Sequence, residues 1–397
     1  MFRHLLKLSW NRKRRNALVM VEITISFIVL FAVVAFATLY AHNYGRPLGF
    51  DSSHVWKVTI DTKVSTDDTW TPEMAEQIRQ LNLAVCDMPE IEHSAGALVA
   101  PYDFGGSYTE TKIDGREIPY QQNEVTDDFD DVLDLEIVRG RWFSREDDGA
   151  SPPPMVVNAY LANELFGSED PVGRIFGEGD NVPGNRIVGV VSDFRKDGEF
   201  SSPAGFAFNR ANLNDPKVRP PRQMLIKVKP ETGAAFEEKL VDRLQQVARG
   251  WSFEVEPITD ARDRTLRVWL APLATGGLVA LFLLIMVGLG LTGVLWQNVT
   301  RRTREIGIRR VQGATVWDVH CQILGELLVV TTLALVVGAV IVLQIPLIDP
   351  FGIVNVSDFA TATLVSAGLI YLLTFLCGLY PSVLATRVQP VEALRHD

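Results

Sequence analysis

Four long apolar runs constrain this chain more than any other feature of its sequence. They cover Ala17–Tyr40, about Trp269–Leu295, about Ile323–Ile348 and about Phe359–Tyr380. A helix of about 20 mostly apolar residues spans the hydrocarbon core of a bilayer, so each run is long enough to cross it. One such run could be a buried helix of a soluble protein, but four predict a membrane protein with four transmembrane helices. The first run is too long for a signal peptide and favours a retained anchor.

Basic residues are distributed unevenly around these runs and predict the side of the membrane that each loop occupies. Residues 1–16 carry six Lys or Arg and no acid, and the 296–322 segment carries five Arg against Glu305 and Asp318. The 349–358 segment has two aspartates and no Lys or Arg. Because basic loops stay in the cytoplasm, both termini and residues 296–322 are expected inside, and residues 43–267 and 349–358 outside.

The segment between the first two runs predicts a folded external domain. Its length of about 225 residues is enough for one or two domains. It contains 25 Lys and Arg against 40 Asp and Glu, so the net charge of −10 of the chain originates here. That acidity argues against a nucleic-acid or anionic-lipid partner for this surface. Alternating and amphipathic patterns predict a mixed α/β fold, with strands at Val55–Asp61, Glu92–Pro101, Gln223–Val228 and Trp251–Ile258 and helices at Pro72–Met88 and Gly233–Ala248.

A second set of patterns predicts an insertion into this α/β frame. Strands at Met155–Val157 and Arg186–Asp193 flank a helix at Asn158–Phe166. Loops are predicted before the first strand, at Ser151–Pro154, and before the second, at Gly177–Gly184. We therefore expect a frame of residues 50–118 and 222–262 around an inserted subdomain of residues 120–210. Trp142 and Phe143 are expected in the core of the insertion, and Cys86 is expected as a buried small residue on its helix.

Motifs that would indicate an enzyme or a metal site are missing from the sequence. It contains no G-x-x-x-x-G-K-[ST] loop, no G-x-S-x-G and no H-E-x-x-H, its six histidines are dispersed, and three cysteines are too few for a zinc site. A G-x-G-x-x-G string at Gly288, Gly290 and Gly293 lies inside an apolar run, where small residues for close helix packing are favoured over a dinucleotide site. We expect no catalytic residue, cofactor or metal in this chain.

The stretch between the second and third runs is the most informative. Thr303–Gln312 is expected to form a short basic helix with Gly313 as its C-terminal cap. Thr315 and Asp318 have the spacing of a capping box that would start the third membrane helix. Ahead of the second run, residues 262–268 contain no Pro or Gly, so a helix is expected to continue from the external domain into the membrane. Pro272 is a place where it could kink.

The same stretch resembles a family signature. The string RTREIGIRRVQGAT is similar to the loop of MacB/FtsX-type (type VII) ABC transporter permeases, and the matching residues are Arg302, Arg304, Glu305, Ile306, Gly307, Ile308, Arg309, Gly313 and Ala314. The C-terminal string resembles the ending of that family through Pro390, Val391, Glu392, Ala393 and Leu394. The strings GRWFSREDD, VNAYLANELFGSEDPVGR and RIVGVVSDFR resemble its periplasmic core domain.

The resemblance implies a permease subunit of a bacterial ABC transporter, in a split form without a fused ATPase. Two copies of a separate ATPase subunit would bind ATP and Mg and dock on the 302–314 segment, and a second permease chain, identical or paralogous, would complete the assembly. ATP-driven closure would move the periplasmic domains, a mechanism called mechanotransmission, for efflux or export of a drug, peptide or lipoprotein. A periplasmic adaptor belongs to some systems, and the chain would lie in the lipid of the inner membrane.

The resulting domain order follows the chain. It has a basic N-terminal helix (1–16), a first transmembrane helix (17–42), a periplasmic MacB-like core domain (43–267), a second helix (268–295), a cytoplasmic coupling loop (296–322), a third helix (323–348), a short periplasmic loop (349–358), a fourth helix (359–380) and a cytoplasmic tail (381–397).

Two other functions stay open. One is an FtsX-like transmembrane signal transducer that controls a periplasmic enzyme. The other is a membrane-anchored receptor whose external domain binds a ligand. About 55 cytoplasmic residues are too few for a catalytic domain, so a cytosolic partner is expected in either case.

Two charged groups fall inside the predicted spans. Glu22 and Glu326 each lie about 8–9 Å past the cytoplasmic flank, at a rise of 1.5 Å per residue. Intramembrane carboxylates are costly and usually face protein or water, so a charge pair or relay that reports ATPase docking is one interpretation. The other is that Glu22 reaches back to the near interface and Glu326 makes a structural hydrogen bond. For Arg304, Glu305 and Arg309, contact with the ATPase is favoured over contact with lipid headgroups.

Overall fold

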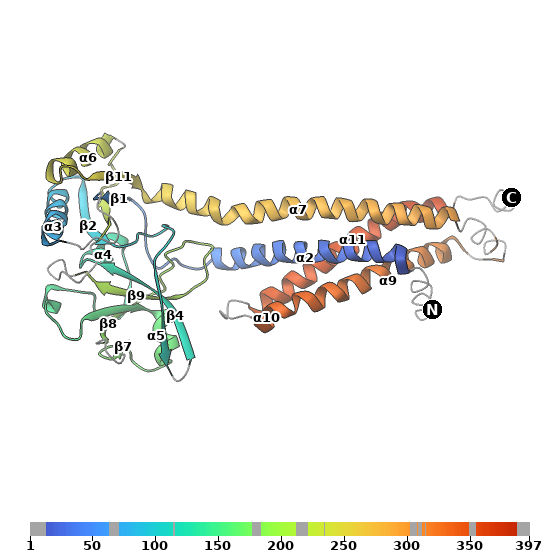
Figure 1. The fold of residues 1–397 in the computed structure, drawn as a ribbon, viewed down its shortest axis with the longest axis horizontal. Helices are drawn as coiled ribbons and strands as arrows, with labels where there is room; N and C mark the ends of the chain where they lie inside the picture. Colours follow the sequence, from blue (N-terminus) through green and yellow to red (C-terminus); the bar gives the residue numbers. More distant parts are fainter. Residues whose placement is uncertain are drawn as a thin grey trace. The chain divides into compact units, whose positions relative to one another are not determined.

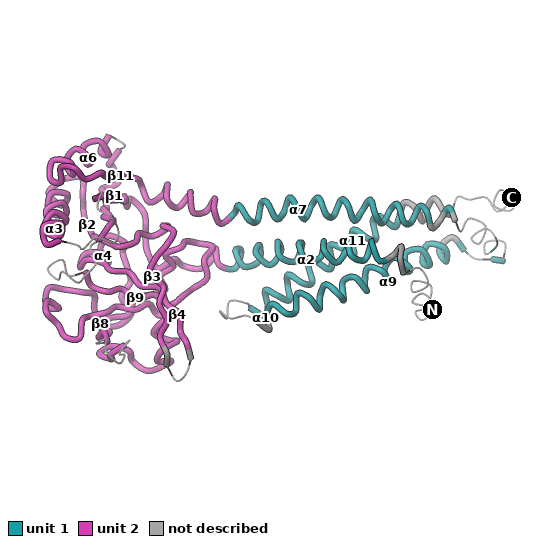
Figure 2. Tube along the Cα trace, viewed as in Figure 1, with its two compact units in different colours: residues 1–42, 270–397 teal, residues 43–269 magenta. Residues whose placement is uncertain are grey.

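The structure is a computed structural model. It describes residues 13–62, 71–113, 116–176, 184–211, 221–233, 235–301, 308, 312–313, 315–348 and 355–386. The chain divides into two compact units (Figure 2). Residues 43–269 form one, called here the extramembrane domain, and residues 1–42 and 270–397 form the other, called the helical unit. The expected N-terminal helix at residues 1–16 lies largely outside the described residues.

In the part of the chain that the structure describes, four helices are long and apolar enough to cross a membrane (Figure 1), as predicted. They are α2 (Lys13–Tyr44), α7 (Ile258–Arg301), α9 (Val316–Val342) and α11 (Val356–Thr386). The third expected span, 323–348, differs from the structure because α9 begins seven residues earlier and ends at Val342. A separate short helix, α10 (Gln344–Ile348), follows it. Helix α7 continues through Pro272 without a break.

The helical unit has one apolar core, to which all four long helices contribute. From α2, Ile23 and Phe27 are fully buried, and Val287, Ala334 and Ile370 join them from the other three helices. Large apolar residues such as Leu278 and Leu364 stay more than two-thirds exposed, as expected for side chains that face lipid rather than water. Small residues let the helices approach: a Cβ on Gly338 would lie 2.5 Å from the Phe27 ring.

The extramembrane domain contains an eleven-stranded mixed sheet (Figure 1). The strands are β1 (Val55–Asp61), β2 (Ile91–Ala97), β3 (Ser107–Ile113), β4 (Arg116–Val125), β5 (Ile137–Gly140), β6 (Pro154–Asn158), β7 (Ile175–Phe176), β8 (Asn185–Val191), β9 (Gly205–Arg210), β10 (Gln223–Val228) and β11 (Ser252–Pro257). Their order is β11-β1-β10-β2-β4-β9-β6-β8-β5, with β3 on β4 and β7 on β8. The helices are α3 (Pro72–Cys86), α4 (Phe129–Leu133), α5 (Ala159–Phe166) and α6 (Ala235–Val247), with a 3-10 turn at Arg145–Asp147.

The sheet narrows at one point. β2 and β4 share a single register pair, Ala97 with Val125, whereas β10 pairs with β2 over six residues. On one side of this junction the four antiparallel strands β11, β1, β10 and β2 pack on α3 and α6 around Leu81, Met224 and Leu240. On the other side β6, β8 and β9 pack on α5 around Met155, Val157 and Leu161.

A third apolar cluster lies across the junction. It joins Ala95, Phe129, Trp142, Phe208 and Leu225, all of which are buried. Trp142 stacks on Phe129 and packs edge-on against Phe208, and Phe143 lies beside it. Trp142 and Phe143 are buried as predicted, but in this cluster, which includes frame residues, and not in a core of the inserted subdomain alone.

Most of the expected elements match the structure to within a few residues. The strands Val55–Asp61 and Gln223–Val228 have the predicted bounds, and the other predicted strands and helices differ at their ends. Strands β3, β4, β5, β7 and β9 and the short helix α4 were not predicted. The expected burial of Cys86 is wrong, because the buried stripe of α3 comprises Ala75, Ile78, Leu81, Ala84 and Val85 and Cys86 falls off it, exposed. The expected loop at 177–184 lies largely outside the described residues.

Candidate coupling segment and buried polar sites

The segment predicted to contact an ATPase is described only in part. Among its matched residues, Ile308 and Gly313 are described. The other seven (Arg302, Arg304, Glu305, Ile306, Gly307, Arg309 and Ala314) and the C-terminal residues Pro390, Val391, Glu392, Ala393 and Leu394 lie outside the described residues. Of the expected helix at Thr303–Gln312, only Ile308 and Gln312 are described. The roles of these residues therefore stay predictions.

The described end of this segment has the local geometry of a helix stop followed by a helix start. The Gln312 amide donates to the Ile308 carbonyl at 3.0 Å, a spacing of four residues, and Gly313 follows with φ of 100°. A Cβ on Gly313 would meet no atom within 4 Å, so the positive φ, not space, requires glycine here.

The capping box predicted at the start of the third helix is present. The Thr315 hydroxyl accepts from the Asp318 amide at 3.2 Å, and the Asp318 carboxylate accepts from the Thr315 amide at 2.9 Å. The carboxylate also accepts from the Thr315 hydroxyl at 2.6 Å. These bonds satisfy amide donors at the first turn of α9.

Glu22 packs against the backbone of a neighbouring helix. It is half-buried on α2, and a Cβ on Gly290 of α7 would lie 2.7 Å from its Oε2 atom. Gly290 therefore makes room for the carboxylate. Glu326 on α9 is also half-buried and takes part in an interaction. Whether the two carboxylates act in coupling stays a prediction.

Hydroxyl groups make further polar contacts between the long helices. Thr24 of α2 donates to the Ala334 carbonyl of α9 at 3.1 Å. Thr331 and Thr374 pair at 3.2 Å, and Thr332 pairs with Tyr371 at 2.9 Å, so α9 and α11 are joined twice. Gly288 lies close to Cys377 of α11, whereas Gly293 has no neighbour within 4 Å of a built Cβ. Two of the three glycines of the G-x-G-x-x-G string thus serve helix contact.

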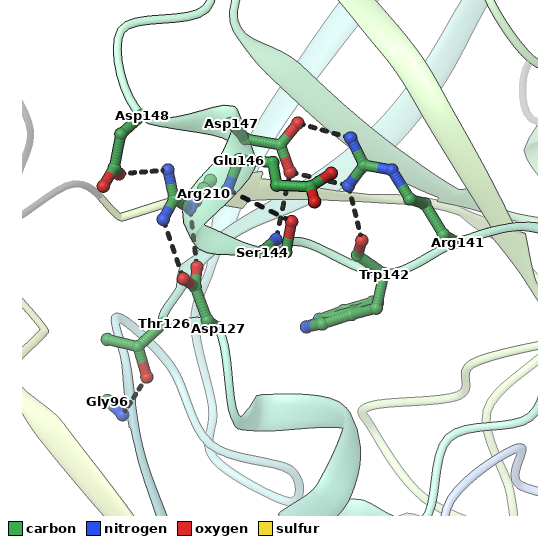
Figure 3. A network of polar contacts seen from close by, with 10 residues as sticks. All are labelled: Gly96, Thr126, Asp127, Arg141, Trp142, Ser144, Glu146, Asp147, Asp148 and Arg210. Carbon is green, nitrogen blue, oxygen red and sulfur yellow. Dashed lines mark hydrogen bonds and ion pairs between the residues drawn. The ribbon is translucent and has the colours of Figure 1, made fainter.

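In the extramembrane domain, the stretch Gly140–Asp148 forms a polar network (Figure 3). Arg141 donates twice to the Asp147 carboxylate at 2.7 Å, and Asp147 closes a capping box with Ser144. The Arg141 hydrogen bonds hold the pKa of Asp147 below its ordinary value. Gly140 has φ of 70° and its built Cβ would lie 2.3 Å from the Val188 carbonyl oxygen. The local fold of the stretch therefore accounts for Gly140, Arg141, Ser144 and Asp147 of the family-like string GRWFSREDD.

The network continues to the narrow junction of the sheet. Arg210, at the end of β9, donates from Nε and one amino nitrogen to Asp127 at 2.6 and 2.7 Å and from the other to Asp148 at 2.7 Å. Asp127 follows Thr126, whose hydroxyl accepts from the Gly96 amide of β2 at 2.9 Å (Figure 3). The Thr126 amide also donates to the Gly96 carbonyl at 3.0 Å, so Thr126 adds two neutral hydrogen bonds across the junction, and the charge-assisted bonds of Arg210 hold the adjoining Asp127 on the β9 side.

Two family models cover most of the chain. Residues 17–243, more than half of it, match the MacB-like periplasmic core domain, and residues 277–390 match the FtsX-like permease C-terminal domain. The chain belongs to the MacB/FtsX-type permease family. The resemblance inferred from its motifs is confirmed, and so is the fold of four membrane helices with a mixed α/β domain between the first two.

Relatives of this MacB/FtsX-type permease include larger proteins. It is 26% identical over 351 residues to the macrolide export ATP-binding/permease protein MacB 2 of Aeromonas hydrophila, covering 85% of this chain and 52% of that protein. It is 26% identical to the pyoverdine export ATP-binding/permease protein PvdT of Pseudomonas aeruginosa, covering 67% of this chain and 41% of PvdT. The chain spans about half the length of the curated relatives it matches.

Solved structures of isolated domains are similar to part of this permease. The periplasmic region of MacB from Actinobacillus actinomycetemcomitans aligns with a TM-score of 0.39 at 14% identity, over 54% of this chain and 94% of that one. The extracellular domain of the noncanonic ABC-type transporter YknZ aligns with a TM-score of 0.35 at 13% identity, over 50% of this chain and 99% of that one.

One polar site in the permease was missed by sequence reasoning. Arg195 is 3% exposed, and its side chain bonds backbone carbonyls up to 152 residues away in the chain. Its only sequence signal is its place in the family-like string RIVGVVSDFR, which gives no indication of those partners. Among the described residues, no group of three His, Cys, Asp or Glu could hold a metal ion.

Proposed function

We propose that this chain is the permease subunit of a bacterial ABC transporter that acts by mechanotransmission. A separate ATPase subunit binds ATP and Mg, and ATP binding and hydrolysis there change the conformation of the extramembrane domain here. The family membership supports a permease, and relatives named as ATP-binding/permease proteins support an ATPase partner. Those relatives are named for export of macrolides and pyoverdine, which supports efflux of a drug, peptide or lipoprotein.

The continuity of α7 carries this proposal. The helix begins at Ile258, which is fully buried in the core of the extramembrane domain. It ends at Arg301, directly before the 302–314 segment that is proposed to dock on the ATPase and is called here the coupling segment. A continuous helix of 44 residues, in which Pro272 lacks the amide for one backbone hydrogen bond, provides a covalent path between the two. Movement of the coupling segment by a docked ATPase would then reach the domain through one element.

The assembly follows from the same proposal. Two permease chains, identical or paralogous, hold two ATPase subunits, and the basic segments support a cytoplasmic location for both termini and residues 296–322. The extramembrane domain then lies in the periplasm, where an adaptor is a further candidate partner. Cys86, exposed in that domain, gives a direct test: a membrane-impermeant maleimide added to spheroplasts labels it if the domain is outside.

The docking step is tested by reversing charge. Arg304→Glu with Arg309→Glu is expected to abolish co-purification of the ATPase subunit with the tagged chain, and with it vanadate-sensitive ATPase activity, while membrane abundance stays unchanged. Arg301→Glu with Arg310→Glu alters charge equally outside the matched residues and is expected to retain the ATPase. Unchanged co-purification in the first variant would show that these arginines do not dock it.

The intramembrane carboxylate on α9 gives a second test. Glu326→Gln keeps the size and hydrogen-bonding capacity of the side chain and removes its charge. We expect it to reduce ATPase activity of the purified complex more than it reduces abundance of the chain in the membrane. The reverse pattern would mean that Glu326 serves the structure of the helical unit.

A further inference from the structure

The loop between β8 and β9 contains an arginine that is satisfied almost entirely by backbone oxygens. Arg195 donates to the carbonyls of Asn43 and Arg46, each at 3.0 Å, and to those of Glu199 at 2.5 Å and Ser201 at 2.7 Å. Burial lowers the pKa of its guanidinium, which nevertheless stays charged. A buried cation held by carbonyls from two separate segments fixes those segments to each other.

The first segment is the end of α2 and the residues after it. The Asn43 side chain, 2% exposed, donates to the Phe200 carbonyl at 3.1 Å and to the Ser202 hydroxyl at 3.3 Å. The Arg195 amide donates to the Leu48 carbonyl at 2.9 Å. A built Cβ on Gly49, whose φ is 81°, would lie 1.3 Å from the Asp193 carbonyl oxygen. Residues 43–49 therefore lie directly on the loop.

The same loop is bonded to the first turns of α7. Glu199, 7% exposed, accepts from Arg262 at 2.5 Å, and the Trp269 indole donates to the Asp197 carbonyl at 3.2 Å. A third connection passes through Tyr102, whose amide donates to the Lys196 carbonyl at 2.8 Å and whose carbonyl accepts from the Thr265 hydroxyl at 2.7 Å. All these residues belong to the extramembrane domain.

We propose that Arg195 and the 193–202 loop, here called the latch, hold the end of α2 and the beginning of α7 together as one body. This rests on the proposed function, in which α2 and α7 carry motion between the membrane and the domain. Arg195 is a positioning residue: without the latch, the two helix ends would move independently and the motion of one would not reach the other. Lysine cannot replace it, because a single ammonium has three donors and no planar fork to span both segments.

The test measures the separation of the two helix ends in the full chain. Cys86, Cys321 and Cys377 are replaced by serine, and spin labels are attached at Gly45→Cys and Val268→Cys in lipid nanodiscs. A built Cβ on Gly45 meets nothing within 4 Å and Val268 is 49% exposed, so both labels are accommodated. We expect one narrow distance distribution. Arg195→Ala should widen it about twofold, with Arg195→Lys between the two, because the multidentate contacts are lost.

Arg210→Ala is the matched control. Arg210 is a partly buried arginine of the same domain, with 9% of its side chain exposed, and its partners Asp127 and Asp148 are far from the latch in sequence. It should destabilise the domain without widening the distribution between residues 45 and 268. If Arg195→Ala leaves the distribution as narrow as Arg210→Ala does, the latch is wrong. If Arg195→Ala does not fold, Asn43→Ala and Arg262→Ala each remove one tether, and a narrow distribution in both overturns the proposal.

A nucleotide-trapped complex separates this inference from the proposed function. With the ATPase co-purified and trapped by ATP and vanadate, the distance between residues 45 and 268 should stay unchanged in the wild type and shift in Arg195→Ala. A shift in the wild type would show that the two ends do not move as one. If no ATPase co-purifies, the proposed function fails, and the distributions of the chain alone still decide the latch.

Discussion

The extramembrane domain and the helical unit bury different kinds of polar group. In the domain, Lys57, Arg195 and Lys196 are each less than 5% exposed, and each is bonded to carboxylate or carbonyl oxygens. In the described part of the helical unit, the buried polar residues are Ser26, Thr331, Ser366 and Thr374, all of them hydroxyls. Both units bury hydroxyls, but charged side chains are buried in the domain and not in the described part of the helical unit.

The difference follows from the solvent. In water, apolar burial drives folding, and a charge can be buried at a junction if its partners are complete. In lipid, the outside is as apolar as the inside, so helices associate by close contact of small residues and by hydrogen bonds. We therefore expect substitutions that add volume and substitutions that remove a charge to change stability by different amounts in the two units.

The largest change in stability should come from replacing one close-packed glycine of each unit by alanine. Gly49→Ala should prevent accumulation of folded chain, a cost above about 3 kcal/mol, because its φ is positive and its Cβ would overlap backbone. Gly338→Ala should cost about 1–2 kcal/mol, because the Phe27 ring it meets can shift. Thermal unfolding and monodispersity of the full chain in detergent measure both. Gly233→Ala, with an ordinary φ and nothing within 4 Å, is the control. A costlier Gly338→Ala would contradict the comparison.

A smaller effect should separate charged from neutral contacts. In a double-mutant cycle, Arg210→Ala and Asp127→Ala should show a coupling of about 2 kcal/mol, because Arg210 is 9% exposed at its side chain and doubly bonded to Asp127. The cycle of Thr331→Val with Thr374→Val should give about 0.6 kcal/mol, typical of hydrogen bonds between membrane helices. Unfolding free energies of the four variants of each cycle give both values. Equal couplings would remove the distinction between the units.

A strand could be predicted when its own sequence carried the apolar pattern of a strand, and was missed when neighbouring strands hold it in place. Strands β1 and β10 alternate or are continuously apolar, so their bounds were predicted. Strand β4 was missed because REIPYQQNEV is polar and contains Pro119. It is held by β3 and β9, which its own pattern does not show. Strand β5 is exposed along its whole length and has β8 as its neighbour. Such strands form because neighbouring strands distant in sequence pair with them.

The candidate sites show the same dependence. The Thr315–Asp318 capping box was predictable because its bonds span three residues. The carbonyls bonded by Arg195 are brought to it by the fold, and no spacing rule identifies them. Cys86 was predicted to be buried, but the buried stripe of the amphipathic helix α3 ends one residue earlier, at Val85. Local hydrogen bonds could be predicted from the sequence, whereas tertiary ones could not.

The last effect that we expect is a dependence of stability on pH in the extramembrane domain. Burial, reinforced by the neighbouring charges of Asp131 and Asp128, raises the pKa of Asp130 to about 6, whereas hydrogen bonds from Arg141 lower the pKa of Asp147. A raised carboxyl pKa means that the folded state binds more protons, so stability from Asp130 falls as pH rises from about 4 to 6. Asp130→Asn should therefore stabilise the chain by about 1 kcal/mol at pH 7.5, after allowance for solvent screening, and have no effect below about pH 4.

Asp147 supplies the opposite sign in the same domain. Its lowered pKa contributes stability that is present at neutral pH and lost as pH falls through the folded pKa, so Asp147→Asn should destabilise the chain at pH 7.5. Unfolding free energies of both variants across this pH range decide the matter. If both substitutions shifted stability in the same direction at pH 7.5, the charge environment of the junction would not be the one that places Asp130 among carboxylates and Asp147 beside Arg141. No comparable dependence is expected from Thr331 and Thr374, because a hydroxyl does not titrate in this range.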